Sequence, residues 1–145
     1  MRIVALLFVV ACAGTQAQDS WKNVYTKSAW SDRDKWQRAN DLIGLMEIGP
    51  GDKVADVGCH EGYMTFKLAT KVGRTGEVFA VDVDQNRLDK LKDHLTEAKV
   101  NNVSVVKGDY DDPKLPFNFI DAVIIIDTYH EMDDHNEILK RYWPH

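Results

Sequence analysis

The sequence predicts an α/β fold with a doubly wound parallel sheet. Short apolar segments with the composition of buried strands alternate with longer segments in which apolar residues recur every three or four positions. Strands that alternate with helices are joined by right-handed crossovers and therefore run parallel. The chain has 145 residues, of which 44% are hydrophobic and 28% charged, as expected for one globular domain.

A helix is expected ahead of the sheet. Ser31 is a candidate N-cap, because Asp34 follows three residues later and such a pair can satisfy two free amides of the first turn. The turn at 49–52 (GPGD) would end this helix. Its apolar face would consist of Trp36, Ala39, Ile43 and Met46.

Two strand–helix pairs are expected next. Residues 53–57 are typical of a buried strand, residues 63–72 of a helix, and residues 77–83 (EVFAVDV) of a second strand. Asp84 is a favourable N-cap for the helix that follows. The apolar face of that helix would hold Leu88, Leu91 and Leu95.

Two more strands complete the expected sheet. Asn101 and Asn102 form a turn before a third strand at 103–107. The fourth strand, at 121–127 (DAVIIID), is nearly all apolar, as a strand covered on both faces should be. Residues 135–143 are expected to begin another helix.

The N-terminus has the pattern of a bacterial secretory signal peptide. In MRIVALLFVVACAGTQAQ, one arginine precedes a short apolar run, and small residues follow. We expect cleavage after Ala17, a signal peptide at 1–17, a domain at 18–145, and an exported protein, periplasmic or secreted. Two alternatives are a lipid anchor at Cys12 and an uncleaved segment. The run is too short for a membrane span.

Charge and cysteine content exclude several classes of function. The formal net charge is -5, so we expect no nucleic-acid surface and no binding to anionic membranes. Removal of Cys12 would leave Cys59 alone, without a disulfide partner. We expect Cys59 to be a small turn residue rather than a redox centre. We expect no metal site, because the side chains of His60 and Glu61 are adjacent and point apart.

Acidic residues and glycines gather where the strands end, the edge at which doubly wound sheets bind ligands. Gly58 and Gly62 follow the first strand and allow a ligand to approach the backbone closely. Asp82 ends the second strand, 20 residues past Gly62, and can accept hydrogen bonds from two ribose hydroxyls. Asp109, after the third strand, can accept from the exocyclic amine of adenine. These features predict an adenosine site.

The charge expected of the ligand distinguishes between two candidate cofactors, NAD and S-adenosylmethionine. NAD carries a pyrophosphate, and its fingerprint G-x-G-x-x-G leads directly into a helix. This chain has Gly58-x-His60-x-Gly62, with Asp56 just before it. An additional carboxylate suits a cationic ligand such as S-adenosylmethionine, which has a sulfonium and an ammonium group.

From about Trp36 to Glu131, the chain resembles the class I S-adenosylmethionine-dependent methyltransferases, which have a Rossmann-like fold. VADVGCHEGYMTFKLA matches their first motif, D-x-G-x-G-x-G, with His60 in place of the middle glycine. VFAVDVDQNRLDKL and VVKGDYDDPKLPFNFIDAVIII resemble the later motifs. RDKWQRANDLIGLMEIGPGDKVADVG resembles a bacterial subgroup with a W-Q element ahead of the sheet.

The resemblance implies S-adenosyl-L-methionine as the cofactor. A side chain at His60 needs either a different backbone conformation from the usual glycine or an orientation away from the methionine moiety. The cofactor-binding positions that the resemblance implies are Asp56, Gly58, His60, Gly62, Asp82, Val83, Asp109, Tyr110 and Asp127.

The segment Asp127-Thr128-Tyr129-His130-Glu131 resembles the fourth motif, which faces the transferred methyl group. His130 and Asp127 are therefore candidate catalytic residues, and His130 would serve as a general base. His130 could equally be a structural histidine of the substrate wall. Methyl transfer often needs only in-line positioning, so the catalytic residues stay unassigned.

We therefore expect an exported class I methyltransferase-like domain that acts on a small molecule. The family sheet has seven strands, whereas this sequence finishes after the fourth, so only the N-terminal part of the fold is expected. Two alternatives stay open: a non-catalytic binding or interaction domain that retains the fold, and a fragment of an NAD-binding oxidoreductase. The methyl acceptor and the oligomeric state are left open.

Overall fold

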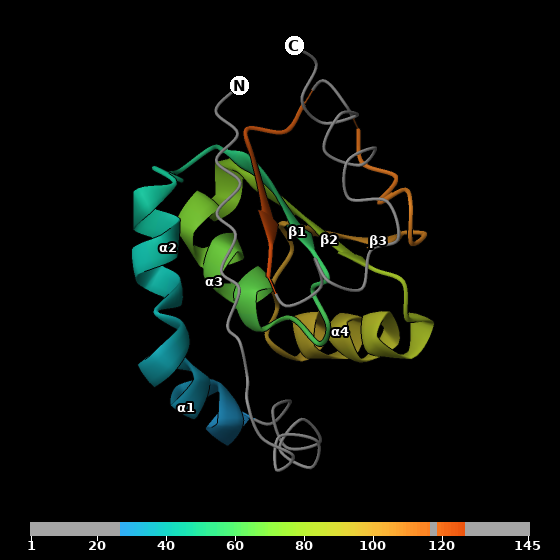
Figure 1. Ribbon diagram of the computed structural model, residues 1–145, viewed down its shortest axis with the longest axis horizontal. Helices are drawn as coiled ribbons and strands as arrows, with labels where there is room; N and C mark the ends of the chain where they lie inside the picture. The colour runs from blue at the N-terminus through green and yellow to red at the C-terminus, as the bar shows by residue number, and fades with distance from the viewer. Residues whose placement is uncertain (1–26, 117–118, 127–145) are drawn as a thin grey trace.

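A computed structural model describes residues 27–116 and 119–126 of the chain. Its centre is a four-stranded sheet in the order β3-β2-β1-β4 (Figure 1). Each of the three neighbouring pairs of strands is parallel. This confirms the predicted α/β fold with a parallel sheet.

The strands lie close to the positions that the sequence predicts. The first and third predictions match at both ends, the second strand ends one residue earlier, and the fourth is shorter at both ends. Buried side chains alternate between the two faces of the sheet along these strands. Val54 and Val78 face one side, and Ala55 faces the other. The four strands are β1 Lys53–Val57, β2 Glu77–Asp82, β3 Val103–Lys107 and β4 Ala122–Ile125.

The strand order places a topological switch point at β1. The chain builds β1, β2 and β3 outward in one direction and then returns, so that β4 pairs with the other side of β1. Sheets of this type bind ligands beyond the carboxyl ends of their strands at such a switch point. The turn after β1 lies at this position.

Helices cover one face of the sheet. Helix α3, Tyr63–Val72, connects β1 to β2 through a short 3-10 turn, η2, at Gly73–Thr75, and α4, Gln85–Glu97, connects β2 to β3. Figure 1 shows α3 between α2 and the sheet, with α4 at the bottom of the view. The fully buried Leu68 of α3 and Leu91 of α4 anchor the two helices to the sheet.

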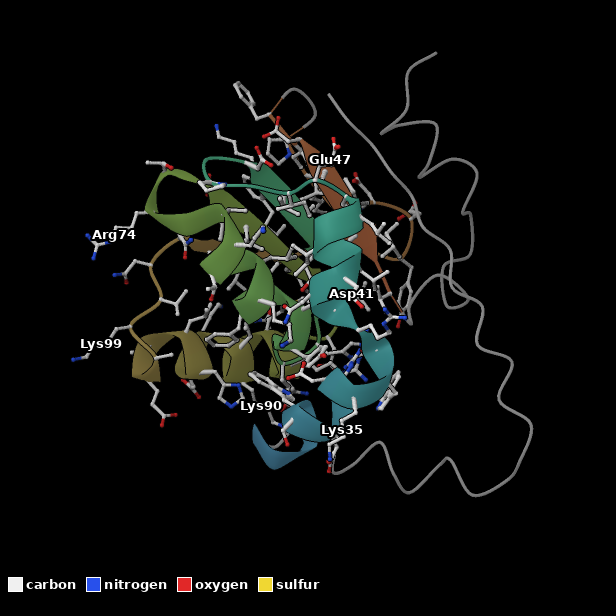
Figure 2. The ribbon with its side chains drawn as sticks, turned by 90° about the vertical axis from the view of Figure 1, so that its left-hand side faces the viewer. Lys35, Asp41, Glu47, Arg74, Lys90 and Lys99 are labelled. Carbon is white, nitrogen blue, oxygen red and sulfur yellow. The ribbon has the colours of Figure 1, made fainter. Side chains whose placement is uncertain are left out.

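Asp84 caps α4 as predicted. Its side chain accepts hydrogen bonds from the backbone N–H groups of Asn86 and Arg87. The leucines at 88, 91 and 95 are all buried, which confirms the predicted apolar face. Charged side chains such as Arg74 and Lys99 extend outward from the ends of the helices (Figure 2).

The prediction of one helix starting at Ser31 was wrong. The structure has two helices, α1 Lys27–Gln37 and α2 Ala39–Leu45, separated by Arg38 in the left-handed conformation (φ 50°). Ser31 lies inside α1 and is not a cap. Trp36 of α1 is 61% exposed, whereas Ala39 and Ile43 of α2 are buried. A left-handed arginine costs about 1–2 kcal/mol, which the packing of α2 on α3 offsets.

The other face of the sheet is covered by the connection between β3 and β4. Leu115 and Ile120 from that connection are buried against Ala55, Val57 and Val81. Within the described ranges, no helix has both the length and the apolar character needed to span a membrane. The expected signal peptide and the helix expected at 135–143 lie outside the described residues.

Candidate functional site

The turn after β1 is built from left-handed backbone positions. Gly58, His60 and Gly62 all have positive φ, at 80°, 51° and 104°. The N–H groups of Gly58 and Cys59 both donate to the carbonyl of Val81, at 2.8 and 3.0 Å. These bonds fasten the turn to the end of β2, so backbone from β1 and β2 forms one surface at the carboxyl edge of the sheet.

Gly62 allows α4 to approach this turn. A Cβ at this position would lie 2.5 Å from Cδ1 of Leu91 and 3.2 Å from a ring carbon of Phe66. Both distances are shorter than ordinary van der Waals contact. Gly62 is therefore required both by its backbone conformation and by close packing.

Gly62→Ala should lower the free energy of unfolding by about 1–3 kcal/mol, because it adds left-handed strain and overlap with Leu91. Urea denaturation measures the change. Gly44→Ala is the matched control, since Gly44 lies in α2 with no atom within 4 Å of an added Cβ, and alanine there should add about 0.5–1 kcal/mol. Equal effects of the two substitutions would contradict this role for Gly62.

His60 occupies the position of the middle glycine without disrupting the turn. Its φ of 51° lies in the left-handed region, where histidine occurs more often than most residues. Its N–H donates to Oδ2 of Asp82 at 2.9 Å. The turn thus keeps a glycine-like backbone conformation at this position.

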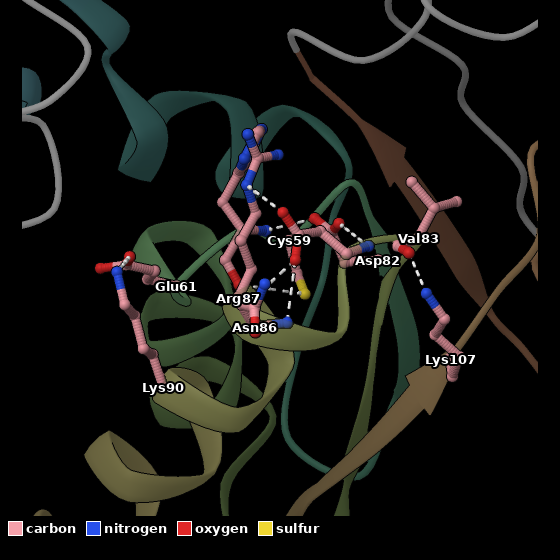
Figure 3. Close-up of polar contacts among 10 residues, drawn as sticks. Cys59, Glu61, Asp82, Val83, Asn86, Arg87, Lys90 and Lys107 are labelled. Carbon is pink, nitrogen blue, oxygen red and sulfur yellow. Dashed lines mark hydrogen bonds and ion pairs between the residues drawn. The ribbon is translucent and has the colours of Figure 1, made fainter.

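Asp82 joins the turn to the start of α4. It is 4% exposed, and its Oδ1 accepts from the N–H of Asp84 at 2.8 Å while Oδ2 accepts from His60. Figure 3 shows Asp82 beside Cys59 of the turn, with Glu61 farther away next to Lys90. A carboxylate can accept about four hydrogen bonds, so each oxygen retains a lone pair for a ligand hydroxyl.

Asp56 lies beneath the turn. It is 3% exposed, and Oγ1 of Thr65 donates to its Oδ2 at 2.6 Å. Burial raises the pKa of Asp56 to about 6, although the Thr65 hydrogen bond and the positive charge of Arg33 lower it. Asp56 therefore faces α3 rather than the open edge of the sheet.

Cys59 is a buried thiol. Burial raises its pKa, and the negative charges of Asp56 and Asp82 raise it further. The neutral thiol is not a nucleophile. This agrees with the expectation that Cys59 is a small turn residue.

Glu61 has a structural partner that the sequence analysis missed. Its buried carboxylate pairs with Nζ of Lys90 at 2.7 Å (Figure 3). Its carbonyl oxygen lies 3.3 Å from Nδ1 of His94. Both partners are on α4 and 29 or more positions away in the sequence. No group of three or more His, Cys, Asp or Glu side chains is placed to hold a metal ion within 27–116 and 119–126.

The loop after β3 meets the same edge of the sheet. The N–H of Gly108 donates to the carbonyl of Asp82 at 3.1 Å, and Nζ of Lys107 donates to the carbonyl of Val83. Asp109 is exposed and forms an ion pair with Lys114 at 2.8 Å. The structure thus brings this loop to Asp82, but it also gives Asp109 a cationic partner that the sequence did not indicate.

Tyr110 follows Asp109 and is 59% exposed. The candidate residues after the fourth strand, Asp127 and His130, lie outside the described residues together with Thr128, Tyr129 and Glu131. Their assigned roles stay predictions. Strand β4 ends at Ile125, directly beside Val57 of β1.

Helix α1 packs over the first turn of α3. The hydroxyl of Tyr63 donates to Oδ1 of Asp34 at 2.7 Å, and Lys67 pairs with the same oxygen at 2.7 Å. These two partners lower the pKa of Asp34. Arg33 is 8% exposed, and its guanidinium carbon lies 4.4 Å from the centroid of the Tyr63 ring. The sequence analysis assigned no role to Arg33.

The charges of this edge favour one kind of ligand. Two carboxylates are buried near the ends of the adjacent strands: Asp56 is the last residue but one of β1, and Asp82 ends β2. Carboxylates so close to the turn would repel a pyrophosphate. A ligand with ribose hydroxyls and a positive charge fits these groups, because Asp82 can accept hydrogen bonds and the backbone of the turn is open to close approach.

Comparison with known proteins indicates the family of this chain. Residues 54–144 match the family model described as a methyltransferase domain. The chain is 30% identical over 83 residues to the aklanonic acid methyltransferase DauC of Streptomyces sp. strain C5, covering 57% of this chain and 38% of that protein. It is 27% identical over 109 residues to a demethylmenaquinone methyltransferase of Listeria monocytogenes, covering 75% of this chain and 45% of that protein.

A solved structure shares the fold. The S-adenosylmethionine-dependent methyltransferase of Aquifex aeolicus superposes with a TM-score of 0.73 at 24% identity, covering 86% of this chain and 65% of that chain. The chain spans less than half the length of the two curated relatives.

Proposed function

Because the chain belongs to the methyltransferase domain family, we propose that it is part of an enzyme that transfers a methyl group from S-adenosylmethionine to a small molecule. The family and the shared fold support S-adenosylmethionine as the cofactor. When bound, it supplies a methyl group on a sulfonium sulfur, which a nucleophile can displace in line.

The observation that carries the proposal is the placement of Asp82. This buried carboxylate ends β2 beside the left-handed turn at 58–62, at the switch point of the sheet. Its oxygens would accept hydrogen bonds from the ribose hydroxyls of the cofactor. The backbone of Gly58 would lie against the methionine portion, and the negative charge of Asp56 would favour a cationic ligand.

A small-molecule acceptor is supported by the two curated relatives, whose names give demethylmenaquinone and aklanonic acid. The net charge of -5 argues against a nucleic-acid substrate. Asp127 and His130 are the proposed residues at the acceptor, and His130 would take a proton from an acidic nucleophile.

The proposed place of action is outside the cytoplasm. The pattern of one arginine, an apolar run and small residues in 1–17 supports export. Cleavage after Ala17 is the proposed processing step, and N-terminal sequencing of the mature protein tests it.

Calorimetric titration of the purified protein with S-adenosylhomocysteine, the demethylated cofactor, tests the proposed function. We expect micromolar binding of S-adenosylhomocysteine and no binding of NAD. Binding of NAD instead would favour the oxidoreductase alternative. Binding of neither ligand by a folded sample would overturn the proposed cofactor site.

A further inference from the structure

Helix α4 contacts the turn after β1 through Glu61 at two points. The buried carboxylate of Glu61 pairs with Nζ of Lys90 at 2.7 Å (Figure 3). Its carbonyl oxygen lies 3.3 Å from Nδ1 of His94, and a carbonyl can only accept, so this contact requires a proton on Nδ1. Lys90 and His94 are one helical turn apart on α4. One helix therefore holds both the side chain and the backbone of Glu61.

The residues on either side of Glu61 are constrained as well. His60 has a left-handed backbone with a φ of 51°, which costs free energy in a residue that has a Cβ and very little in glycine. On the other side, Gly62 packs so closely on Leu91 of α4 that an added Cβ would lie 2.5 Å from Cδ1. The contacts of α4 at 61 and 62 therefore oppose the return of His60 to a more relaxed conformation.

The burial of Glu61 determines what the loss of its partner would do. The side chain of Lys90 is 62% exposed, so solvent screens part of its attraction to the carboxylate. The side chain of Glu61 is only 6% exposed, and without the lysine its charge would be poorly compensated. The carboxylate could then regain solvation only if the turn moved outward. The ion pair thus keeps the turn closed against α4.

We propose that Glu61 and Lys90 are positioning residues of the cofactor site, which hold His60 in the left-handed conformation that binds the ligand. The pair acts through the backbone of the turn and not by touching the ligand. The inference rests on the proposed function, and it accounts for a histidine in place of the middle glycine of the motif. Molecules in which His60 leaves this conformation would not bind, so the apparent affinity falls with the fraction that remains competent.

The test measures the site and the turn separately. Calorimetry gives the dissociation constant of S-adenosylhomocysteine. Hydrogen exchange, followed by NMR in the ligand-free protein, gives the protection of the amide at position 60, which donates to Asp82 in the closed turn. Urea denaturation gives the global stability.

The variants are Glu61→Gln, Lys90→Met and Lys90→Arg, each made alone and together with His60→Gly. Glutamine keeps the size of glutamate without its charge, and arginine keeps the cation of lysine. Lys92→Met is the matched control, because Lys92 is also on α4 but pairs with the exposed Asp89 of the same helix.

Glu61→Gln and Lys90→Met should each weaken binding of S-adenosylhomocysteine by about 3- to 10-fold, the value of one partly buried ion pair. Exchange of the amide at position 60 should become faster. Lys90→Arg should recover most of the affinity. Together with His60→Gly, the same substitutions should cost less than about twofold relative to His60→Gly alone, because glycine adopts the left-handed conformation readily. Lys92→Met should change neither the affinity nor the exchange.

Unchanged affinity in Glu61→Gln and Lys90→Met, even with lower global stability, would overturn the inference and leave the pair with a stabilising role only. Equal losses with and without His60→Gly would also overturn it, because the pair would then not act through the backbone at position 60. In both cases the unmodified protein still binds S-adenosylhomocysteine, so the proposed function stands. Failure of the unmodified protein to bind this ligand would overturn the proposed function and this inference together.

Discussion

Asp82→Ala should weaken the binding of S-adenosylhomocysteine by about 2–4 kcal/mol, because it removes the acceptor of charge-assisted hydrogen bonds from the ribose. The substitution also frees the N–H groups of His60 and Asp84, which Asp82 holds at 2.9 and 2.8 Å. The turn after β1 would then lose its connection to the start of α4. Calorimetric titration measures the affinity, and urea denaturation measures the accompanying loss of stability.

A matched control separates these two effects. Asp84→Ala removes the cap of α4, which should cost about 1 kcal/mol of stability, but it leaves Asp82 in place. We expect Asp84→Ala to bind S-adenosylhomocysteine with nearly unchanged affinity. An Asp82→Ala protein that retains full affinity would show that Asp82 is not the ribose ligand.

Asp56→Asn should stabilise the protein at pH 8. The pKa of Asp56 is about 6 in the folded protein, against 3.8 for the unfolded reference. The folded state therefore holds this proton to a higher pH than the unfolded state, so the contribution of Asp56 to stability falls as the pH rises from about 4 to 6. Above pH 6 the penalty is complete, at up to about 3 kcal/mol. Asparagine carries no charge and can still accept the hydrogen bond from Thr65.

Urea denaturation at pH 4 and pH 8 measures this difference. The free energy of unfolding of the Asp56→Asn protein should exceed that of the unmodified protein at pH 8 and converge with it near pH 4. The gain should come with weaker binding of S-adenosylhomocysteine, by about tenfold, if the charge of Asp56 favours the ammonium group of the ligand. Parallel stability curves across this pH range would show that Asp56 is not a buried, destabilised carboxylate.

The core of the fold could be predicted from the sequence because its signals are local. β1, β3 and α3 have the predicted bounds, since glycine or asparagine turns flank each of them and apolar residues fill their buried positions. The break at Arg38 could not be predicted, because no glycine or proline precedes it. It depends on the burial of Ala39 and Ile43 against α3, which is a tertiary contact.

The candidate site could also be predicted only in part. The left-handed glycines and the placement of Asp82 follow from motif spacing, because the turn and the end of the neighbouring strand are set by the parallel pairing of β1 and β2. The ion pair of Glu61 with Lys90 and the position of Arg33 above Tyr63 were missed. Each joins residues that are about 30 positions apart, and long polar side chains carry no periodic signal of such contacts.

The burial of Cys59 gives the turn a built-in chemical reporter. Alkylating reagents react with an accessible thiolate, and here the thiol is both covered and held neutral. Modification of Cys59 requires the turn to separate from the end of β2, so the labelling rate of Cys59 reports local opening of this segment rather than unfolding of the whole domain. A ligand that bridges the turn and Asp82 would slow the reaction in proportion to its occupancy. The labelling rate of Cys59 thus reports how often the turn opens, with and without a bound ligand.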